Sequence, residues 1–389
     1  MKRFFCIALF AVIVVFQGAA QDVETYTALY DGTESIIDRL ALLKEVSAAQ
    51  LSDADEFFAN ALRRLLTEYP TVHSLQNKEA ADSMARLLAE ELGTRKYLAA
   101  GQNLWRVVEV FPNAVVKADA LIALGKMEAV DLFPQVVQIL QDMNAHPTPD
   151  RQEGERIAFG AILALENYGK IEGYLPVYFA STAWYSDRVR NQAEASMEVL
   201  AEDPTEQFIA VIRGSSYSYE AKYRALYDAD ANARISSPSK AQAAVAALDE
   251  GWRAATREPR YRTVLTSMRK LAIGMINRYR PEDAAAYPLL ERSYRYGTDT
   301  QEKLDAIAAL ASLGTDDAVQ RLSNFIMVIN GRLQAKVINA DDQQMIRALI
   351  SAVGNSGNSL GRLALQTVSA LNWTNPIKAL ANEALEKLR

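Results

Sequence analysis

Apolar residues recur along this chain with the spacing of one buried helix face. The segment Tyr261–Tyr279 shows it clearly, because its apolar residues follow the i, i+3, i+4, i+7 rule, and Asp53–Tyr69 repeats the pattern. Strand-like alternation of β-branched or aromatic residues with polar ones is nearly absent. The pattern predicts an all-α protein whose helices begin with capping residues such as Thr33, Asp53 and Asn77.

The predicted helices are short and come in pairs that repeat. Each repeat has an alanine-rich first helix, a short turn, and a second helix with larger apolar residues. Five first helices align on alanines spaced by 41, 34, 111 and 42 residues, namely Ala120, Ala161, Ala195, Ala306 and Ala348. We expect two less regular pairs inside the longest gap, around Ala225 and Met268. Small side chains let first helices lie close together, and stacked pairs bury a continuous core.

Part of this repeat resembles a known family. The segment Leu310–Leu322 reads Leu-Ala-Ser-Leu-Gly-Thr-Asp-Asp-Ala-Val-Gln-Arg-Leu, which resembles a HEAT repeat, and the resemblance extends over residues 115–212 and 300–371. Tetratricopeptide arrays look similar, but their regular period of 34 residues is missing. The resemblance implies a right-handed α-solenoid of stacked antiparallel helix pairs, and HEAT proteins are mostly binding scaffolds. The predicted parts are a signal peptide (1–20), divergent N-terminal helical repeats (21–114), HEAT-like repeats (115–371) and a C-terminal capping helix (372–389).

The N-terminus has the layout of a secretory signal peptide. Lys2 and Arg3 form a basic start, Phe4–Phe16 is an apolar run, and Gly18 and Ala20 precede a cleavage site. The apolar run is too short for a spanning helix, which needs about 20 residues. We therefore expect an exported protein, periplasmic or secreted, with no transmembrane span after the signal peptide is removed.

Composition narrows the function classes further. Cys6 is the only cysteine, so the mature chain has no disulfide, thiol nucleophile or cysteine metal site. The formal charge is −6, and removal of Lys2 and Arg3 would make it −8. This acidity argues against general nucleic-acid binding, which requires a strongly basic domain.

Candidate catalytic groups are few. The two histidines, His73 and His146, are predicted in loops, and neither has the spacing of a zinc site or a nucleophile elbow. Acidic pairs such as Asp316 and Asp317 allow an alternative, a polysaccharide-active helical enzyme that uses two carboxylates. Most such pairs begin helices, where they satisfy free N–H groups. We therefore expect a protein that is not an enzyme and has no cofactor and no metal.

One segment reverses the charge of the chain. Between Trp252 and Tyr296, ten Lys and Arg residues face four Asp and Glu residues, and aromatic residues are interleaved. Arg and Tyr are enriched at binding hot spots. On one helix, Arg262, Arg269 and Arg280 would form a stripe about 40° wide beside the apolar face. The candidate binding residues are Arg253, Arg257, Arg262, Arg269, Arg280, Tyr261, Tyr279 and Tyr294.

Two interpretations of this segment remain open. In the first, the segment lies in a solenoid groove that binds either an acidic segment of a protein partner or an anionic polymer. In the second, the tyrosines cover the core and the arginines pair with acidic neighbours. The first interpretation requires Arg262, Arg269 and Arg280 to lie together on one accessible surface.

Overall fold

The protein is helical throughout the residues that the structure describes. The computed structural model describes residues 22–254 and 256–388, and within these ranges it contains twenty α-helices, five short 3₁₀ turns and no strand. The all-α prediction is therefore confirmed. The predicted signal peptide, including Cys6, lies outside the described residues.

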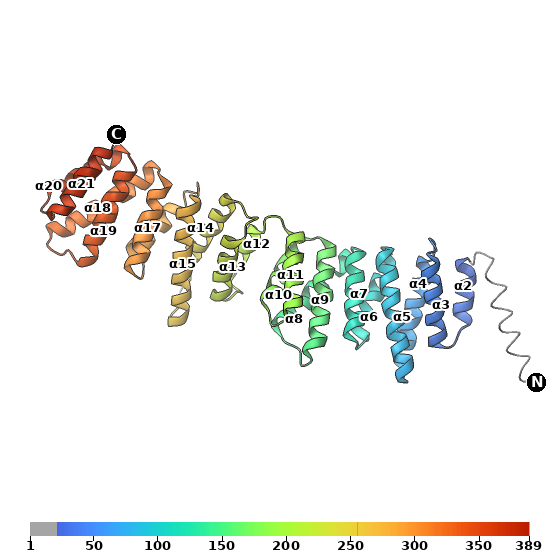
Figure 1. Ribbon diagram of the computed structural model, residues 1–389. Coiled ribbons are helices and arrows are strands. Elements are labelled where there is room, and N and C mark those ends of the chain that lie inside the picture. Colours follow the sequence, from blue (N-terminus) through green and yellow to red (C-terminus); the bar gives the residue numbers. More distant parts are fainter. Residues whose placement is uncertain (1–21, 255, 389) are drawn as a thin grey trace, which may run out of the picture. The chain divides into compact units, whose positions relative to one another are not determined.

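The helices group into two compact units, which we call unit 1 (described residues 22–201) and unit 2 (described residues from 202 to 388). They are labelled along the chain in Figure 1. The helices of unit 1 are α2 (Val23–Gly32), α3 (Ile36–Ala49), α4 (Asp55–Glu68), α5 (Leu75–Thr94), α6 (Gly101–Val110), α7 (Ala114–Lys126), α8 (Phe133–Ala145), α9 (Arg151–Tyr168), α10 (Tyr174–Thr182) and α11 (Asp187–Leu200). The helices of unit 2 are α12 (Thr205–Arg213), α13 (Tyr219–Ala231), α14 (Ser237–Arg253), α15 (Pro259–Tyr279), α16 (Ala286–Tyr296), α17 (Thr300–Leu313), α18 (Asp316–Gln334), α19 (Ala340–Asn355), α20 (Arg362–Ala370) and α21 (Asn375–Lys387). The predicted boundaries after residues 114 and 371 stay predictions.

Within each unit, alternate helices pack on one another. In unit 1, α3, α5, α7, α9 and α11 follow one another side by side, and α4, α6, α8 and α10 lie on the other side of them. Unit 2 repeats the scheme, with α13, α15, α17, α19 and α21 in one row and α12, α14, α16, α18 and α20 in the other. The two irregular pairs are present as predicted, because Ala225 lies in α13 and Met268 in α15. The handedness of the stacking stays a prediction.

Small residues allow the first helices to approach closely. A Cβ atom added at Gly125 of α7 would lie 2.6 Å from the Cα of Ala164 in α9. Further along the same two helices, a Cβ at Gly160 would lie 2.6 Å from the Cα of Ala118. Because real Cβ contacts are essentially never this short, the two helices can pack this closely only with glycine at these two positions.

The predicted helix starts differ from the observed ones by one to three residues. Ser35 and Ser74 cap α3 and α5 with their side chains, whereas Thr33 ends α2 and Asn77 lies inside α5. Helix α4 begins after Ala54 rather than Asp53 and has no side-chain cap. Several residues near each start can cap a helix, and the position at which packing begins decides which one does.

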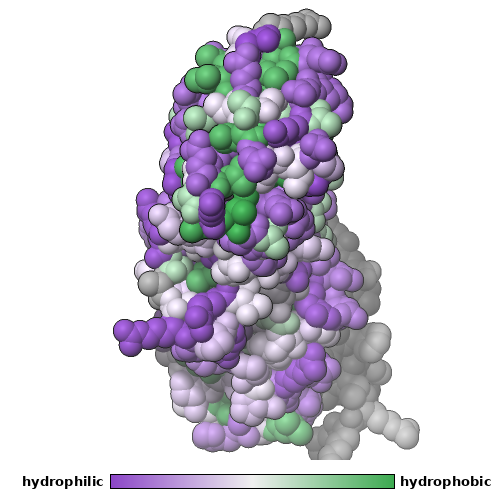
Figure 2. All heavy atoms as spheres, turned by 90° about the vertical axis from the view of Figure 1, so that its left-hand side faces the viewer, coloured by the Kyte–Doolittle hydropathy of each residue, from purple (hydrophilic) through white to green (hydrophobic). Residues whose placement is uncertain are grey.

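The C-terminal helix α21 packs on α19 and α20, and its role as a cap stays a prediction. Its buried face carries Ile377 and Ala381, whereas Glu383, Glu386 and Lys387 are exposed as expected. Figure 2 looks onto this end of the chain and shows hydrophobic side chains among the hydrophilic ones.

Candidate partner-binding site

The two units differ strongly in charge. Described unit 1 residues (22–201) include 16 Lys and Arg against 27 Asp and Glu, whereas residues 202–389 include 24 against 21. Unit 1 is therefore acidic by 11 charges and unit 2 is basic by 3 charges. The basic segment thus lies in the unit whose average field also favours an anion.

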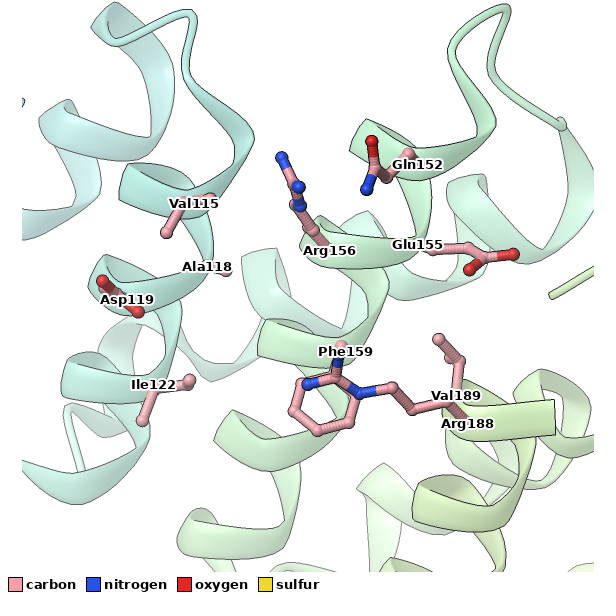
Figure 3. A pocket seen from close by; sticks show the side chains of 10 residues that line it. All are labelled: Val115, Ala118, Asp119, Ile122, Gln152, Glu155, Arg156, Phe159, Arg188 and Val189. Atoms are coloured by element: carbon pink, nitrogen blue, oxygen red, sulfur yellow. The ribbon is translucent and has the colours of Figure 1, made fainter. Parts of the chain in front are cut away.

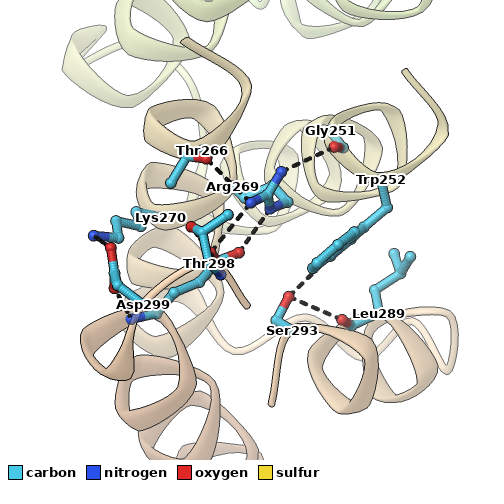
Figure 4. A network of polar contacts seen from close by, with 10 residues as sticks. Gly251, Trp252, Thr266, Arg269, Lys270, Leu289, Ser293, Thr298 and Asp299 are labelled. Atoms are coloured by element: carbon cyan, nitrogen blue, oxygen red, sulfur yellow. Dashed lines mark hydrogen bonds and ion pairs between the residues drawn. The ribbon is translucent and has the colours of Figure 1, made fainter. Parts of the chain in front are cut away.

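Arg269, predicted on an accessible stripe, is buried at the centre of a polar network (Figure 4). Its Nε donates to Oε1 of Glu302 at 2.6 Å, and Nη2 donates to Oε2 at 3.2 Å. The same Glu302 oxygen, Oε2, accepts from the backbone N–H and the hydroxyl of Thr298, both at 2.9 Å. The side chains of Arg269 and Glu302 are 7% and 0% exposed, so each charge depends on the other for neutralisation.

The predicted stripe of three arginines is therefore wrong. Arg262 and Arg280 are exposed, but Arg269 between them is enclosed by α14, α15 and the start of α17. Arg262 and Arg280 are 18 residues apart, which on a helix corresponds to about 27 Å. Glu302, the ion-pair partner of the buried Arg269, comes from another helix 33 residues away, so positions along α15 alone do not reveal that Arg269 is buried.

Arg257, Arg262 and Arg269 nevertheless line one cavity. This cavity, which we call the Trp252 cavity, has a volume of about 400 Å³ and lies between the end of α14, the loop that follows it and the start of α15. Its lining residues are Gly251, Trp252, Ala254, Thr256, Arg257, Arg262, Leu265, Thr266, Arg269 and Thr298. No Asp or Glu is among them. The side chains of Arg257 and Arg262 are exposed and form no ion pair or hydrogen bond with any described residue, so no carboxylate compensates the positive charge at the rim.

Trp252 is held as a rigid wall of this cavity. Its Nε1 donates to Oγ of Ser293 at 3.0 Å, and that hydroxyl donates to the carbonyl of Leu289 at 3.1 Å (Figure 4). The guanidinium carbons of Arg269 and Arg292 lie 4.2 and 5.0 Å from the centroid of the Trp252 ring. Cation–π attraction and the indole hydrogen bond together fix the ring without a ligand.

The remaining predicted arginines lie away from the cavity lining. Arg253 ends α14 and pairs with Asp249 at 3.0 Å, so it is an ordinary solvated ion pair. Arg280 follows α15 in a left-handed conformation with φ of 50°, at the opposite end of the helix from Arg262.

The predicted tyrosines are dispersed. Tyr261 packs its ring edge against Tyr219, with 5.3 Å between centroids, and Tyr279 donates from its hydroxyl to Asp230 at 2.7 Å. Tyr294 stacks on Phe325 with 3.9 Å between centroids, and burial raises its pKa to about 12. Of these three tyrosines, Tyr294 covers a core residue, the buried Phe325.

Sequence reasoning did not select Trp252, Gly251 or Glu302 as site residues. Trp252 was visible as an aromatic residue in a basic segment, but nothing local distinguished it from the tyrosines. At Gly251, a Cβ would lie 2.6 Å from Cγ of Arg269, so the glycine provides the space through which the arginine stem passes. Each of these roles depends on contacts between helices distant in sequence.

The acidic pairs and histidines serve local structure. Asp317 pairs with Arg321 at 3.2 Å, and Asp316 accepts from the amide of Asn358 at 2.6 Å. Where a carboxyl pKa is shifted among the described residues, it is lowered, whereas a general acid of glycoside hydrolysis needs a raised pKa. His73 and His146 are exposed, as predicted.

The described part of the chain has neither a metal-binding cluster nor a membrane-spanning helix. No group of three or more His, Cys, Asp or Glu residues is arranged to hold a metal ion there. Nor does any described helix combine the length and apolarity that crossing a bilayer requires.

Comparison with known proteins found similarity to solved structures and to no family model or curated protein. No family model matches the chain, and no curated protein matches it. Among solved structures, it is similar to human deoxyhypusine hydroxylase in complex with glycerol, at 14% identity and a TM-score of 0.26, over 78% of this chain and 98% of that chain.

This match contradicts the prediction that the chain is not an enzyme, because the matched protein is an enzyme by its name. That prediction is withdrawn. At this TM-score, the similarity transfers no activity, substrate or residue to the chain.

Proposed function

We propose that this chain binds an acidic segment of a partner protein, and that the Trp252 cavity receives one of its carboxylates. The observation that carries the proposal is the pair Arg257 and Arg262, two exposed guanidinium groups without a carboxylate partner beside a fixed indole ring. Arg presents a planar fork of donors that matches a carboxylate. An anionic ligand would thus supply the negative charge that the cavity lining lacks.

The floor of the cavity supports binding by being rigid before the ligand arrives. Arg269 and Glu302 neutralise each other there, so the floor contributes shape rather than net charge. Thr256 and Thr266 add hydroxyl groups to the lining. A preorganised site spends less free energy on ordering its side chains when it binds.

The wider assignment is also part of this proposal. We infer that the alternating helix rows are repeats of the HEAT kind, because the closest HEAT-like sequence, Leu310–Leu322, spans the end of α17 and the start of α18. Such arrays commonly present extended binding surfaces. We also propose export to the periplasm or the medium, on the strength of the N-terminal basic and apolar segment.

The proposal is tested with a fluorescein-labelled hexaglutamate peptide and the purified chain, with fluorescence anisotropy as the measurement. Arg257→Gln and Arg262→Gln should each weaken binding about 10- to 100-fold, because one charge-assisted hydrogen bond contributes about 1.5–3 kcal/mol. Binding should also weaken as salt screens the charges.

Arg280→Gln is the matched control. It removes the same charge from the same basic segment, but from the far end of α15, and should leave the affinity within about twofold. If Arg280→Gln weakens binding as much as Arg262→Gln does, the peptide responds to general charge and the cavity is not the site. Unchanged affinity in both cavity variants would equally reject the proposal.

A further inference from the structure

Unit 1 contains a second cavity that combines free cations with an apolar floor. We call it the Phe159 cavity; its volume is about 410 Å³. One face of α7 supplies Val115, Ala118, Asp119 and Ile122, and one face of α9 supplies Gln152, Glu155, Arg156 and Phe159. Arg188 and Val189 of α11 complete the lining. Figure 3 shows Arg156 pointing into the space between α7 and α9, and Arg188 reaching toward Phe159.

The two carboxylates in this lining are already engaged. Asp119 pairs with Arg86 at 2.6 Å. Glu155 accepts from the backbone N–H and the hydroxyl of Ser186 at 2.8 and 2.7 Å, and from Arg151 at 2.9 Å. Although burial opposes them, these hydrogen bonds hold the pKa of Glu155 below its ordinary value of 4.5. In Figure 3 its carboxylate points away from the other lining side chains.

The two arginines, by contrast, have no carboxylate among the described residues. The side chain of Arg156 is exposed and makes no ion pair or hydrogen bond with a described residue. Arg188 is exposed, and its guanidinium carbon lies 5.0 Å from the centroid of the Phe159 ring. Stacking on the ring orders this guanidinium and leaves its N–H donors free for a ligand.

The composition of the cavity selects the ligand class. Val115, Ile122 and Phe159 are only half-buried, so they offer apolar surface to a ligand. Unit 1 as a whole is acidic by 11 charges, so its field repels a polyanion. Within the cavity, two uncompensated arginines can still hold a single carboxylate at short range.

We propose that the Phe159 cavity binds the C-terminus of a peptide whose last side chain is apolar. The terminal carboxylate bridges Arg156 and Arg188, and the apolar side chain covers Val115, Ile122 and Phe159. This site is independent of the Trp252 cavity, and it excludes the acidic runs that the Trp252 cavity accepts.

The test uses the full chain and the labelled tetrapeptide Ala-Ala-Leu-Leu, with a free or an amidated C-terminus. The free acid should bind saturably. Amidation, Arg156→Gln and Arg188→Gln should each weaken binding at least about tenfold, because each removes one end of a charge-assisted contact. Arg106→Gln is the matched control: Arg106 is an exposed arginine of α6 that does not line the cavity, and its removal should leave the affinity unchanged. Unfolding midpoints of the four proteins should agree, since exposed charges contribute little to stability.

Several results would overturn the proposal. If the amide binds as tightly as the free acid, apolar contact alone explains the binding. If Arg106→Gln weakens binding as much as the two cavity variants do, general charge attraction explains it. Absence of saturable binding would reject the site outright. Decanoate that binds more tightly than the peptide would assign the cavity to free amphipathic carboxylates instead. Hexaglutamate binding should not change in Arg156→Gln or Arg188→Gln, which separates failure here from failure of the Trp252 cavity.

Discussion

The buried pair of Arg269 and Glu302 should be among the most sensitive points of unit 2. In Glu302→Ala, the guanidinium of Arg269 loses both hydrogen bonds to the carboxylate, and its remaining hydrogen-bond acceptors are the carbonyl of Gly251 at 3.3 Å and the hydroxyl of Thr266 at 3.2 Å. Removal of one member of a buried ion pair costs about 3–5 kcal/mol. Unit 2 has 188 residues, and for that size 1 kcal/mol shifts Tm by about 2–4 °C, so we expect a loss of about 6–20 °C.

The double variant Arg269→Met with Glu302→Leu separates the pair from its surroundings. Because both charges are then absent, it should be more stable than Glu302→Ala, although it removes more polar contacts. The assay is urea unfolding of the full chain followed by tryptophan fluorescence, since Trp252 stacks on Arg269 and reports on this part of unit 2. A Glu302→Ala variant within about 1 kcal/mol of the wild type would refute the reasoning. The reasoning would also be refuted if the double variant lost as much stability as Arg269→Met and Glu302→Leu lose together when each is made alone.

The remaining predictions concern stability elsewhere in the described chain. Gly160→Ala should destabilise unit 1 by about 1–3 kcal/mol, because its Cβ would overlap Ala118, and urea unfolding measures the loss. Gly274→Ala, in α15 with nothing within 4 Å of the added Cβ, should instead stabilise unit 2 by about 1 kcal/mol, and a loss there would contradict the packing described. The hydrogen bond from Lys270 lowers the pKa of Asp299 below its ordinary 3.8, so its contribution is complete above that value and is lost as the pH falls through the lower folded-state pKa. Asp299→Asn should therefore flatten the acid side of the stability profile, and an unchanged profile would reject this assignment.

The fold was predictable because its information is local. The repeating alanines and the i, i+3, i+4, i+7 pattern predicted the helices and even the two irregular pairs around Ala225 and Met268. Helix starts were less accurate, because Ser35 and Thr33 can both cap and only packing chooses between them.

The site was predictable only in part. Charge and aromatic content drew attention to a segment in which Arg257 and Arg262 line one cavity, whereas its role in binding stays a proposal. The prediction that grouped Arg269 with Arg280 considered the positions on one helix alone. The burial of Arg269 depends on Glu302, which belongs to another helix. The Phe159 cavity has no sequence signature, because its two arginines come from α9 and α11 and lie in an acidic unit.

The most direct test of the account is to identify what occupies the Trp252 cavity in cells that express the chain. Thr256 lines the cavity, so replacing it with p-benzoylphenylalanine places a photo-crosslinker there without removing either free arginine. Mass spectrometry of the crosslinked peptides should recover one partner protein, joined through a segment rich in Asp and Glu. The crosslink should disappear when Arg257→Glu and Arg262→Glu are added. Crosslinks to segments without acidic residues, or crosslinks that persist after both charge reversals, would contradict the central claim.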